Sequence, residues 1–341
     1  MGASVALVAL LGSGQQFDVY TWPMNIFITG GAGFIGSHLA ECFLAKGDSV
    51  KALDNFSTGS IDNLRKAGIE AIVGDIRDKN LVEELTRESD VVLHMAAALG
   101  VSNIMNKTLE SISTNIAGSE IVLNAATKFD KRIIIASTSE IYGKNPKQPL
   151  SEDDDRVIGN PQKIRWSYSD AKAIEEAMAT SLFLDKKLKV TTVRFFNTVG
   201  PRQTGQYGMV VPRFVQSAIK GEDLLVHGDG SQTRVFCHIE DAAAGLISLI
   251  GDTNTYGEVY NIGGVGETSI LALANKVIER TRSSSKVKLI PYTDVYPTGF
   301  EDMQRRVPDT SKITKQTGWT SKKTLDNIID DVKDFFLSTQ N

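Results

Sequence analysis

The chain has 341 residues and a formal net charge of −4, and its lysines and arginines form no basic stripe. This balance argues against a nucleic-acid partner. Cys42 and Cys237 are the only cysteines, too few for a disulfide framework and without metal-ligand spacing. We therefore expect a cytoplasmic protein with no bound metal and no membrane association, long enough for one large or two joined domains.

The first 23 residues differ from the rest of the chain. Their apolar run, residues 4–11, is too short to span a bilayer and has no basic flank of the kind that a secretory signal needs. We expect residues 1–23 to be a disordered extension, and the folded domain to begin at Met24. An atypical signal peptide is the less favoured alternative.

A glycine-rich segment, Thr29-Gly-Gly-Ala-Gly-Phe-Ile-Gly36, joins an apolar run at 25–29 to an amphipathic pattern at 34–46. This order predicts a strand, a tight turn and a helix. Gly30 permits the turn, Gly33 lets a pyrophosphate approach the backbone, and Gly36 lets the helix press on the sheet. Small residues also occur where a helix packs closely on a strand, but the flanking patterns favour a dinucleotide site.

A second predicted strand, residues 49–53, ends in Asp54, which lies 18 residues past Gly36. A carboxylate at this position accepts hydrogen bonds from ribose hydroxyls and repels the extra phosphate of NADP. The sequence therefore predicts NAD as the cofactor.

Strand-like and helical patterns alternate through the first half of the chain, which is typical of parallel βαβ units. This predicts an α/β fold with a Rossmann-type, doubly wound parallel sheet. Further strands are expected at 71–73, 91–94, 132–136 and 190–196, and helices at 79–87, 109–128 and 168–184.

Glycine and proline become more frequent after residue 196, which indicates a smaller, discontinuous C-terminal substrate domain. We expect the chain to return to the large sheet near 235–250. The predicted NAD-binding domain comprises 24–196 and 233–262, and the predicted nucleotide-sugar-binding domain comprises 197–232 and 263–341.

Tyr168 and Lys172 are four residues apart, so on a helix they share one face. A lysine ammonium beside a phenol favours the phenolate and so lowers the pKa of the tyrosine. Thr138 follows the strand expected at 132–136, at the edge of the sheet where ligands gather. Together these three side chains predict proton transfer beside the dinucleotide.

Over residues 24–336, the chain resembles the extended short-chain dehydrogenases/reductases of the nucleotide-sugar epimerase/dehydratase family. The motifs that carry the resemblance are the glycine segment, Asp54, Gly-Asp75-Ile-Arg, His94-Met-Ala-Ala97, the Thr138/Tyr168/Lys172 set, Arg194-Phe-Phe-Asn197 and Gly228-Asp-Gly-Ser-Gln-Thr-Arg234.

The resemblance implies a role for each matching residue. Thr138 would form a hydrogen bond with the reacting hydroxyl, Tyr168 would be the base, and Lys172 would bind the nicotinamide ribose. The implied NAD-binding residues are Gly30, Gly33, Phe34, Ile35, Gly36, Asp54, Asn55, Asp75, Ile76, Ala96, Ala97, Asn115, Tyr168 and Lys172. The implied substrate-binding residues are Thr138, Asn197, Val211, Arg234 and Arg306, with a UDP-linked sugar as the substrate.

The family resemblance leaves the reaction open after a first oxidation at the sugar's 4-position. We favour a UDP-hexose 4-epimerase similar to UDP-glucose 4-epimerase. Ser139-Glu140 replaces the Asp-Glu pair of family dehydratases, which counts against dehydration.

The alternative is a UDP-glucuronate decarboxylase, because the segments 165–168 and 299–308 resemble such enzymes. Glu140 and Arg306 would then act at the carboxylate. The segment 98–101 departs from the loop typical of UDP-xylose synthases, which weighs against that alternative. A non-catalytic NAD-binding protein is a remote third reading.

Relatives of this family pair as dimers through two helices. The helices expected at 109–128 and 168–184 would form this four-helix interface, so we expect a homodimer. Periodicity alone does not separate an interface from packing on the sheet.

Overall fold

The computed structural model of the chain describes residues 23–65, 67–98, 108–205, 209–295 and 303–339. The extension expected at 1–23 lies outside the described residues except for Pro23. Of the segment 98–101, only Ala98 is described, and of the segment 299–308, only residues 303–308.

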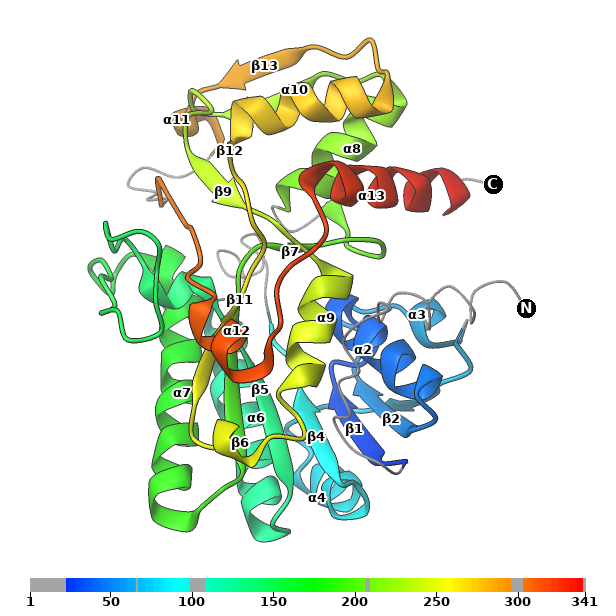
Figure 1. Ribbon diagram of the computed structural model, residues 1–341, viewed down its shortest axis with the longest axis vertical. Coiled ribbons are helices and arrows are strands. Elements are labelled where there is room, and N and C mark those ends of the chain that lie inside the picture. The colour runs from blue at the N-terminus through cyan, green and yellow to red at the C-terminus, as the bar shows by residue number, and fades with distance from the viewer. Residues whose placement is uncertain (1–22, 66, 99–107, 206–208, 296–302, 340–341) are drawn as a thin grey trace.

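The larger lobe is built on a parallel sheet of seven strands in the order β11-β6-β5-β4-β1-β2-β3 (Figure 1). Its central strands are buried along their whole length, as expected for a parallel sheet covered on both faces. This confirms the predicted fold class. The strands are β1 (Asn25–Thr29), β2 (Ser49–Asp54), β3 (Glu70–Val73), β4 (Val91–His94), β5 (Arg132–Thr138), β6 (Val190–Phe195) and β11 (Val259–Ile262).

Helices cover both faces of this sheet. Ile26 and Ile28 of β1 pack with α2 (Phe34–Ala45) and α9 (Ile239–Ser248) in one core cluster. Phe27, between them, points to the opposite face, where it packs in a second cluster. The helices of that second face are α4 (Lys79–Glu88), α6 (Thr108–Lys128) and α7 (Ser167–Lys186).

The return of the chain to the large sheet differs from the expectation. The region near 235–250 contains the short strand β10 (Cys237–His238) and helix α9, whereas the sheet strand β11 comes later, at Val259–Ile262. Eight of the ten residues of α9 are buried, so its sequence lacks the amphipathic pattern that marks a surface helix.

The smaller lobe has its own hydrophobic core. Helices α8 (Val210–Lys220), α10 (Ile270–Thr281) and α13 (Leu325–Thr339) pack around Phe214, Leu273 and Ile329 and lie above the large sheet in Figure 1. The structure thus has two lobes, while the exact domain boundaries stay a prediction. The remaining strands are β7 (Thr198–Val199), β8 (Leu224–His227), β9 (Thr233–Val235), β12 (Glu267–Ser269) and β13 (Val287–Ile290). The remaining helical segments are α3 (Asp62–Arg65), η1 (Ser139–Tyr142), η2 (Ile164–Trp166), η4 (Thr253–Thr255), α11 (Tyr292–Val295) and α12 (Ser311–Thr317).

Helices α6 and α7 pack side by side and carry exposed apolar side chains. Leu109 is 80% exposed, and Ile174 and Leu184 are also exposed. The homodimer stays a prediction that the mass in solution can check. Within the described ranges, no helix combines the length and apolar character needed to cross a membrane.

Candidate functional site

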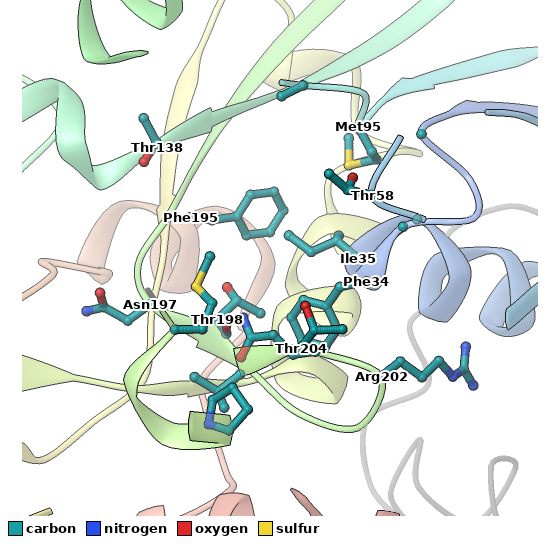
Figure 2. Close-up of a pocket in the computed structure, with 18 of the residues that line it drawn as sticks. Phe34, Ile35, Thr58, Met95, Thr138, Phe195, Asn197, Thr198, Arg202 and Thr204 are labelled. Carbon is teal, nitrogen blue, oxygen red and sulfur yellow. Dashed lines mark hydrogen bonds between the residues drawn. The ribbon is translucent and has the colours of Figure 1, made fainter. Parts of the chain in front are cut away.

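A cavity of about 820 Å³ lies between the carboxyl edge of the large sheet and the smaller lobe. Ligands of open parallel sheets bind at this edge, and the volume is in the usual range for small-molecule sites. In the view of Figure 2, Phe195 lies between Thr138, at the end of β5, and Ile35, at the start of α2.

Most of the predicted site residues line this one cavity. They are Gly30, Gly33, Phe34, Ile35, Gly36, Asp54, Asn55, Ile76, Ala96, Ala97, Thr138, Glu140, Tyr168, Asn197, Val211, Arg234 and Arg306. Asp75, Asn115 and Lys172 are not part of the lining.

The glycine turn has the geometry that its sequence predicts. Gly30 has a φ of 66°, which favours glycine. A Cβ on Gly36 would lie 2.2 Å from the carbonyl oxygen of Gly30, so helix α2 can approach the turn this closely only because residue 36 has no side chain. No side chain caps the N-terminus of α2, which leaves its first amides suited to a phosphate.

Asp54 is buried at the end of β2 and holds the glycine turn. Its Oδ2 accepts a hydrogen bond from the backbone N–H of Ala32 at 2.9 Å, and its Oδ1 accepts one from Phe56 at 2.8 Å. Burial raises the pKa of Asp54, although these backbone hydrogen bonds oppose the rise. The carboxylate also borders the cavity, where the ribose of a dinucleotide on the glycine turn would lie.

Two of the residues outside the lining have local partners. Arg77 donates two hydrogen bonds to Asp75, at 2.9 and 2.7 Å, and holds the pKa of that carboxyl at about 2. Asn115 accepts from the backbone N–H of Ala98 at 2.7 Å and donates to its carbonyl at 3.1 Å. Asn115 therefore fixes the segment after β4, beside the cavity.

Thr138 and Tyr168 reach the cavity from different elements. Thr138 ends β5, where its Oγ1 accepts a hydrogen bond from the N–H of Glu140 at 3.2 Å. Tyr168 lies in the first turn of α7. Burial raises the pKa of Tyr168 well above its usual range, and the carboxylates of Glu175 and Glu140 raise it further.

The net direction in this structure is therefore opposite to the lowering of the tyrosine pKa that is expected from Lys172, and the effect of Lys172 itself stays a prediction. The ammonium of Lys172 donates to Glu175 at 2.8 Å, and both residues are 1% exposed. The neighbouring carboxylate offsets the positive charge that was expected to stabilise the phenolate.

Three charged side chains meet at one end of the cavity. Arg165 donates two hydrogen bonds to Glu140, at 2.6 and 2.9 Å. Nη1 of Arg306 lies 3.5 Å from Glu140 and 3.3 Å from Oγ of Ser139. Burial disfavours the charged form of Glu140, but the guanidinium groups of Arg165 and Arg306 outweigh this effect and hold the pKa of Glu140 at about 2. Glu140 is therefore a carboxylate at neutral pH.

The segment that carries Arg306 is fixed by backbone hydrogen bonds. The N–H of Val307 donates to Oε1 of Gln148 at 2.8 Å. Leu150 donates to the carbonyl of Val307 and accepts from the N–H of Asp309, both at 2.8 Å. These contacts place Arg306 beside Glu140, although 166 residues separate them in sequence.

The smaller lobe contributes Asn197, Val211 and Arg234 to the lining. Arg234 is buried, and its Nη1 donates to the carbonyls of Thr233 and Met303 at 2.8 Å each. It is thus not the exposed residue of a surface salt bridge. Asn197 donates to the carbonyl of Val235 at 2.8 Å.

Two residues in or beside the site were not assigned a role from the sequence. Arg165 belongs to the segment 165–168, whose resemblance predicts no role for it, and Glu175 belongs to none of the predicted motifs. The spacing of Glu175, three residues after Lys172 on a helix, is the signal that could have identified it. In the part of the chain that the structure describes, no cluster of three or more His, Cys, Asp or Glu could hold a metal ion.

The sequence is similar to curated enzymes over most of its length. It is 46% identical over 289 residues to UDP-N-acetyl-alpha-D-glucosaminuronate decarboxylase of Bacillus cytotoxicus, covering 84% of this chain and 89% of the relative. It is 34% identical over 299 residues to UDP-glucuronic acid decarboxylase 1 of Danio rerio, covering 86% and 68%. These relatives favour the decarboxylase alternative over the preferred 4-epimerase.

The fold is similar to that of solved epimerases. UDP-glucose 4-epimerase of Thermotoga maritima, solved with UDP-glucose, gives a TM-score of 0.84 at 28% identity, covering 93% of this chain and 100% of that one. The enzyme of the same name from Thermus thermophilus, solved as a complex with NAD, gives 0.80 at 28% identity, covering 92% and 99%.

A family model described as GDP-mannose 4,6 dehydratase matches residues 27–332. Together with the cavity and the relatives, this match identifies the chain as an enzyme that modifies nucleotide sugars with NAD. The chain belongs to the nucleotide-sugar epimerase/dehydratase family of the extended short-chain dehydrogenases/reductases.

Proposed function

We propose that the enzyme decarboxylates a UDP-linked uronate, with UDP-N-acetylglucosaminuronate as the first candidate. The observation that carries the proposal is the pair of buried guanidinium groups, Arg165 and Arg306, around Glu140 in the cavity. A sugar carboxylate needs such a positive environment in a buried site. The 46% identity to an enzyme named for that substrate supports it.

The residues of this chain fit a bound NAD at the glycine turn and Asp54. NAD, when bound, would accept the hydride from the sugar's C4 and could return it. Tyr168 would take the proton of the C4 hydroxyl, and Thr138 would hold that hydroxyl by a hydrogen bond. This step leaves a ketone at C4.

The carboxylate at C6 is then β to the ketone, so the bond between C5 and C6 can break with its electrons moving to the C4 carbonyl. Carbon dioxide leaves an enolate, which takes up a proton from water at C5 and so restores the ketone at C4. The 3.5 Å contact of Arg306 with Glu140 is the longer of the two arginine contacts, so Arg306 is the guanidinium better able to turn to the substrate. Glu140, held as an anion by Arg165, would repel the substrate carboxylate and lose that repulsion as carbon dioxide departs.

The epimerase remains the second candidate, because the solved structures with a similar fold include UDP-glucose 4-epimerases. In that reading Arg306 would bind the diphosphate instead of a carboxylate. The neutral sugar would then leave Glu140 without a direct role in the reaction.

The substrate test offers UDP-N-acetylglucosaminuronate, UDP-glucuronate, UDP-N-acetylglucosamine and UDP-glucose in parallel, with products identified by NMR. We expect a uronate to lose carbon dioxide and give a UDP-linked pentose or its 4-keto form. The neutral sugars should be unchanged. Epimerisation of a neutral sugar without release of carbon dioxide from either uronate would contradict the proposal.

Arg306→Ala should lower kcat on the uronate by about 100-fold, the usual scale for removing one electrostatic contact to the reacting group. The matched control is Arg305→Ala, because Arg305 is an adjacent but exposed arginine that pairs with Glu267 at 2.7 Å. Exposed pairs of this kind contribute little, so we expect the control to keep near-normal turnover.

Affinity for UDP separates the two readings of Arg306. If Arg306 meets the sugar carboxylate, calorimetric titration with UDP should give the same Kd for wild type and Arg306→Ala. A large loss of UDP affinity, with kcat preserved, would assign Arg306 to the diphosphate and reject its role in decarboxylation.

Asp54 should make the apo-protein bind NAD at least about tenfold more tightly than NADP at neutral pH, since a carboxylate opposes the 2′-phosphate. Burial raises the pKa of Asp54, so its charge is lost at a higher pH than for an ordinary aspartate. The preference should therefore weaken as the pH falls, and Asp54→Asn should weaken it at neutral pH. Equal affinity of the wild type for both nucleotides, measured by fluorescence titration, would refute the assignment.

A further inference from the structure

Tyr292 lines the cavity from the smaller lobe. Strand β13 pairs in parallel with β8, and Ile290 lies opposite His227 at the carboxyl ends of the two strands. The short helix α11 begins at Tyr292, two residues after Ile290 (Figure 1). The strand pairing therefore brings Tyr292 close to His227, which also lines the cavity.

The phenol of Tyr292 is held by a buried amide. Nε2 of Gln232 donates to the carbonyl of His227 at 3.1 Å and to Oη of Tyr292 at 3.0 Å. A backbone carbonyl only accepts hydrogen bonds, so the contact with His227 fixes which end of the Gln232 amide carries the nitrogen. Gln232 is 8% exposed, and its position thus fixes the hydroxyl end of the tyrosine.

The ring of Tyr292 lies against the backbone of Gly228. A Cβ on Gly228 would lie 2.4 Å from Cε2 of Tyr292 and 2.9 Å from its Cδ2. The φ of Gly228 is 75°, which also favours glycine. The ring can therefore occupy this position only because residue 228 has no side chain.

The order of the proposed contacts along the cavity assigns this end to the nucleobase. The reacting sugar would lie at Thr138 and Arg306, and its diphosphate at Arg234. The dinucleotide would occupy another wall, at the glycine turn and Asp54. The base of a nucleotide sugar lies on the far side of the diphosphate from the sugar. It would therefore lie beyond Arg234, toward Gln232, which also lines the cavity.

The charge and polarity of the smaller-lobe wall suit a nucleoside diphosphate. The acidic residues of the described lining, Glu41, Asp54, Asp62 and Glu140, all come from the larger lobe. Around Tyr292 the wall is partly apolar, because Phe236 and Ile270 line the cavity and the N–H of Ile270 donates to the carbonyl of Gln232 at 3.0 Å. An apolar wall suits the faces of a base.

We propose that Tyr292 binds the uracil of the substrate through the face of its ring. This inference rests on the proposed UDP-linked substrate, and it gives a role to a residue outside the family motifs. The ring is held by Gly228 and Gln232 before the ligand arrives, so binding costs little side-chain entropy. Planar bases stack on aromatic side chains of this kind.

The test is calorimetric titration of the enzyme, saturated with NAD, with UDP. Tyr292→Leu should weaken the binding of UDP about tenfold, the scale of one base–aromatic contact. Tyr292→Phe keeps the ring and loses only the hydrogen bond to Gln232, so its Kd for UDP should stay much closer to wild type. The Kd of the apo-protein for NAD should be the same in wild type and both variants.

Gly228→Ala tests the position of the ring without changing Tyr292. The added Cβ would displace the ring, so we expect this variant to weaken the binding of UDP as well. The matched control is Gly221→Ala, because Gly221 has a similar φ of 71° and an added Cβ there meets nothing within 4 Å. The control carries the same backbone strain without moving a ring, so it should bind UDP like wild type.

The nucleotide 5,6-dihydrouridine diphosphate separates the base from the ribose and the diphosphate. Its base is no longer planar but keeps the carbonyl and N–H groups of uracil. Wild type should bind UDP more tightly than the dihydro nucleotide, and Tyr292→Leu should remove most of this difference. Equal losses of affinity for both nucleotides in Tyr292→Leu would place Tyr292 against the ribose or the diphosphate and overturn the proposal.

An unchanged Kd for UDP in Tyr292→Leu would also overturn the proposal. So would an equal weakening of NAD binding in that variant, because it would show a general effect on the fold. Uronates and neutral sugars share the UDP group, so the titration does not depend on the reaction. If neither uronate releases carbon dioxide while Tyr292→Leu still loses affinity for UDP, the proposed reaction is rejected and the role of Tyr292 stands.

Discussion

The ion pair between Glu140 and Arg165 is the interaction on which the candidate site depends. Glu140 lies in the short helix η1 that follows β5, and Arg165 lies in the short helix η2 that precedes α7, the helix that carries Tyr168. Ser169 of that helix also donates to the carbonyl of Glu140 at 2.9 Å. These contacts fix Thr138 relative to Tyr168, so one buried pair both builds the catalytic geometry and sets the charge at the carboxylate end of the cavity. Breaking such a pair leaves a buried charge without a partner.

Charges are compensated in two zones, one in the cavity and one beside it. In the first zone, the two guanidinium groups of Arg165 and Arg306 face the single carboxylate of Glu140 and hold its pKa at about 2. At the other, Glu175 offsets Lys172 behind Tyr168. The first zone suits an anionic substrate group, and the second fixes the ammonium of Lys172 on α7. The excess of guanidinium groups in the first zone fits chemistry on a negatively charged sugar.

The sequence predicted the parts of the site that depend on local patterns. The glycine turn, β1 and α7 follow from short motifs, because backbone conformation and period are encoded within a few residues. Asp54 was placed correctly at the end of β2, but its hydrogen bonds to Ala32 and Phe56 were not foreseen.

The remaining features depend on packing between distant segments. Arg306 meets Glu140 only because residues 307–309 pair with the loop at Leu150, which no local pattern encodes. Burial and the carboxylates of Glu175 and Glu140 raise the pKa of Tyr168 in this structure, and this environment is not encoded in the spacing of Tyr168 and Lys172. Helix α9 is buried on most sides and therefore lacks an amphipathic pattern. Without that pattern, periodicity does not distinguish this helix from the sheet strand expected near 235–250, and the strand itself, β11, comes later in the chain.

The central claim is that the cluster around Glu140 receives the carboxylate of the sugar. A crystal structure of the Tyr168→Phe variant with NAD and UDP-N-acetylglucosaminuronate tests it most directly. We expect the sugar carboxylate within hydrogen-bond distance of Arg306, and the C4 hydroxyl against Thr138. A diphosphate bound to Arg306, with the carboxylate directed away from the cluster of Glu140, Arg165 and Arg306, would contradict the account.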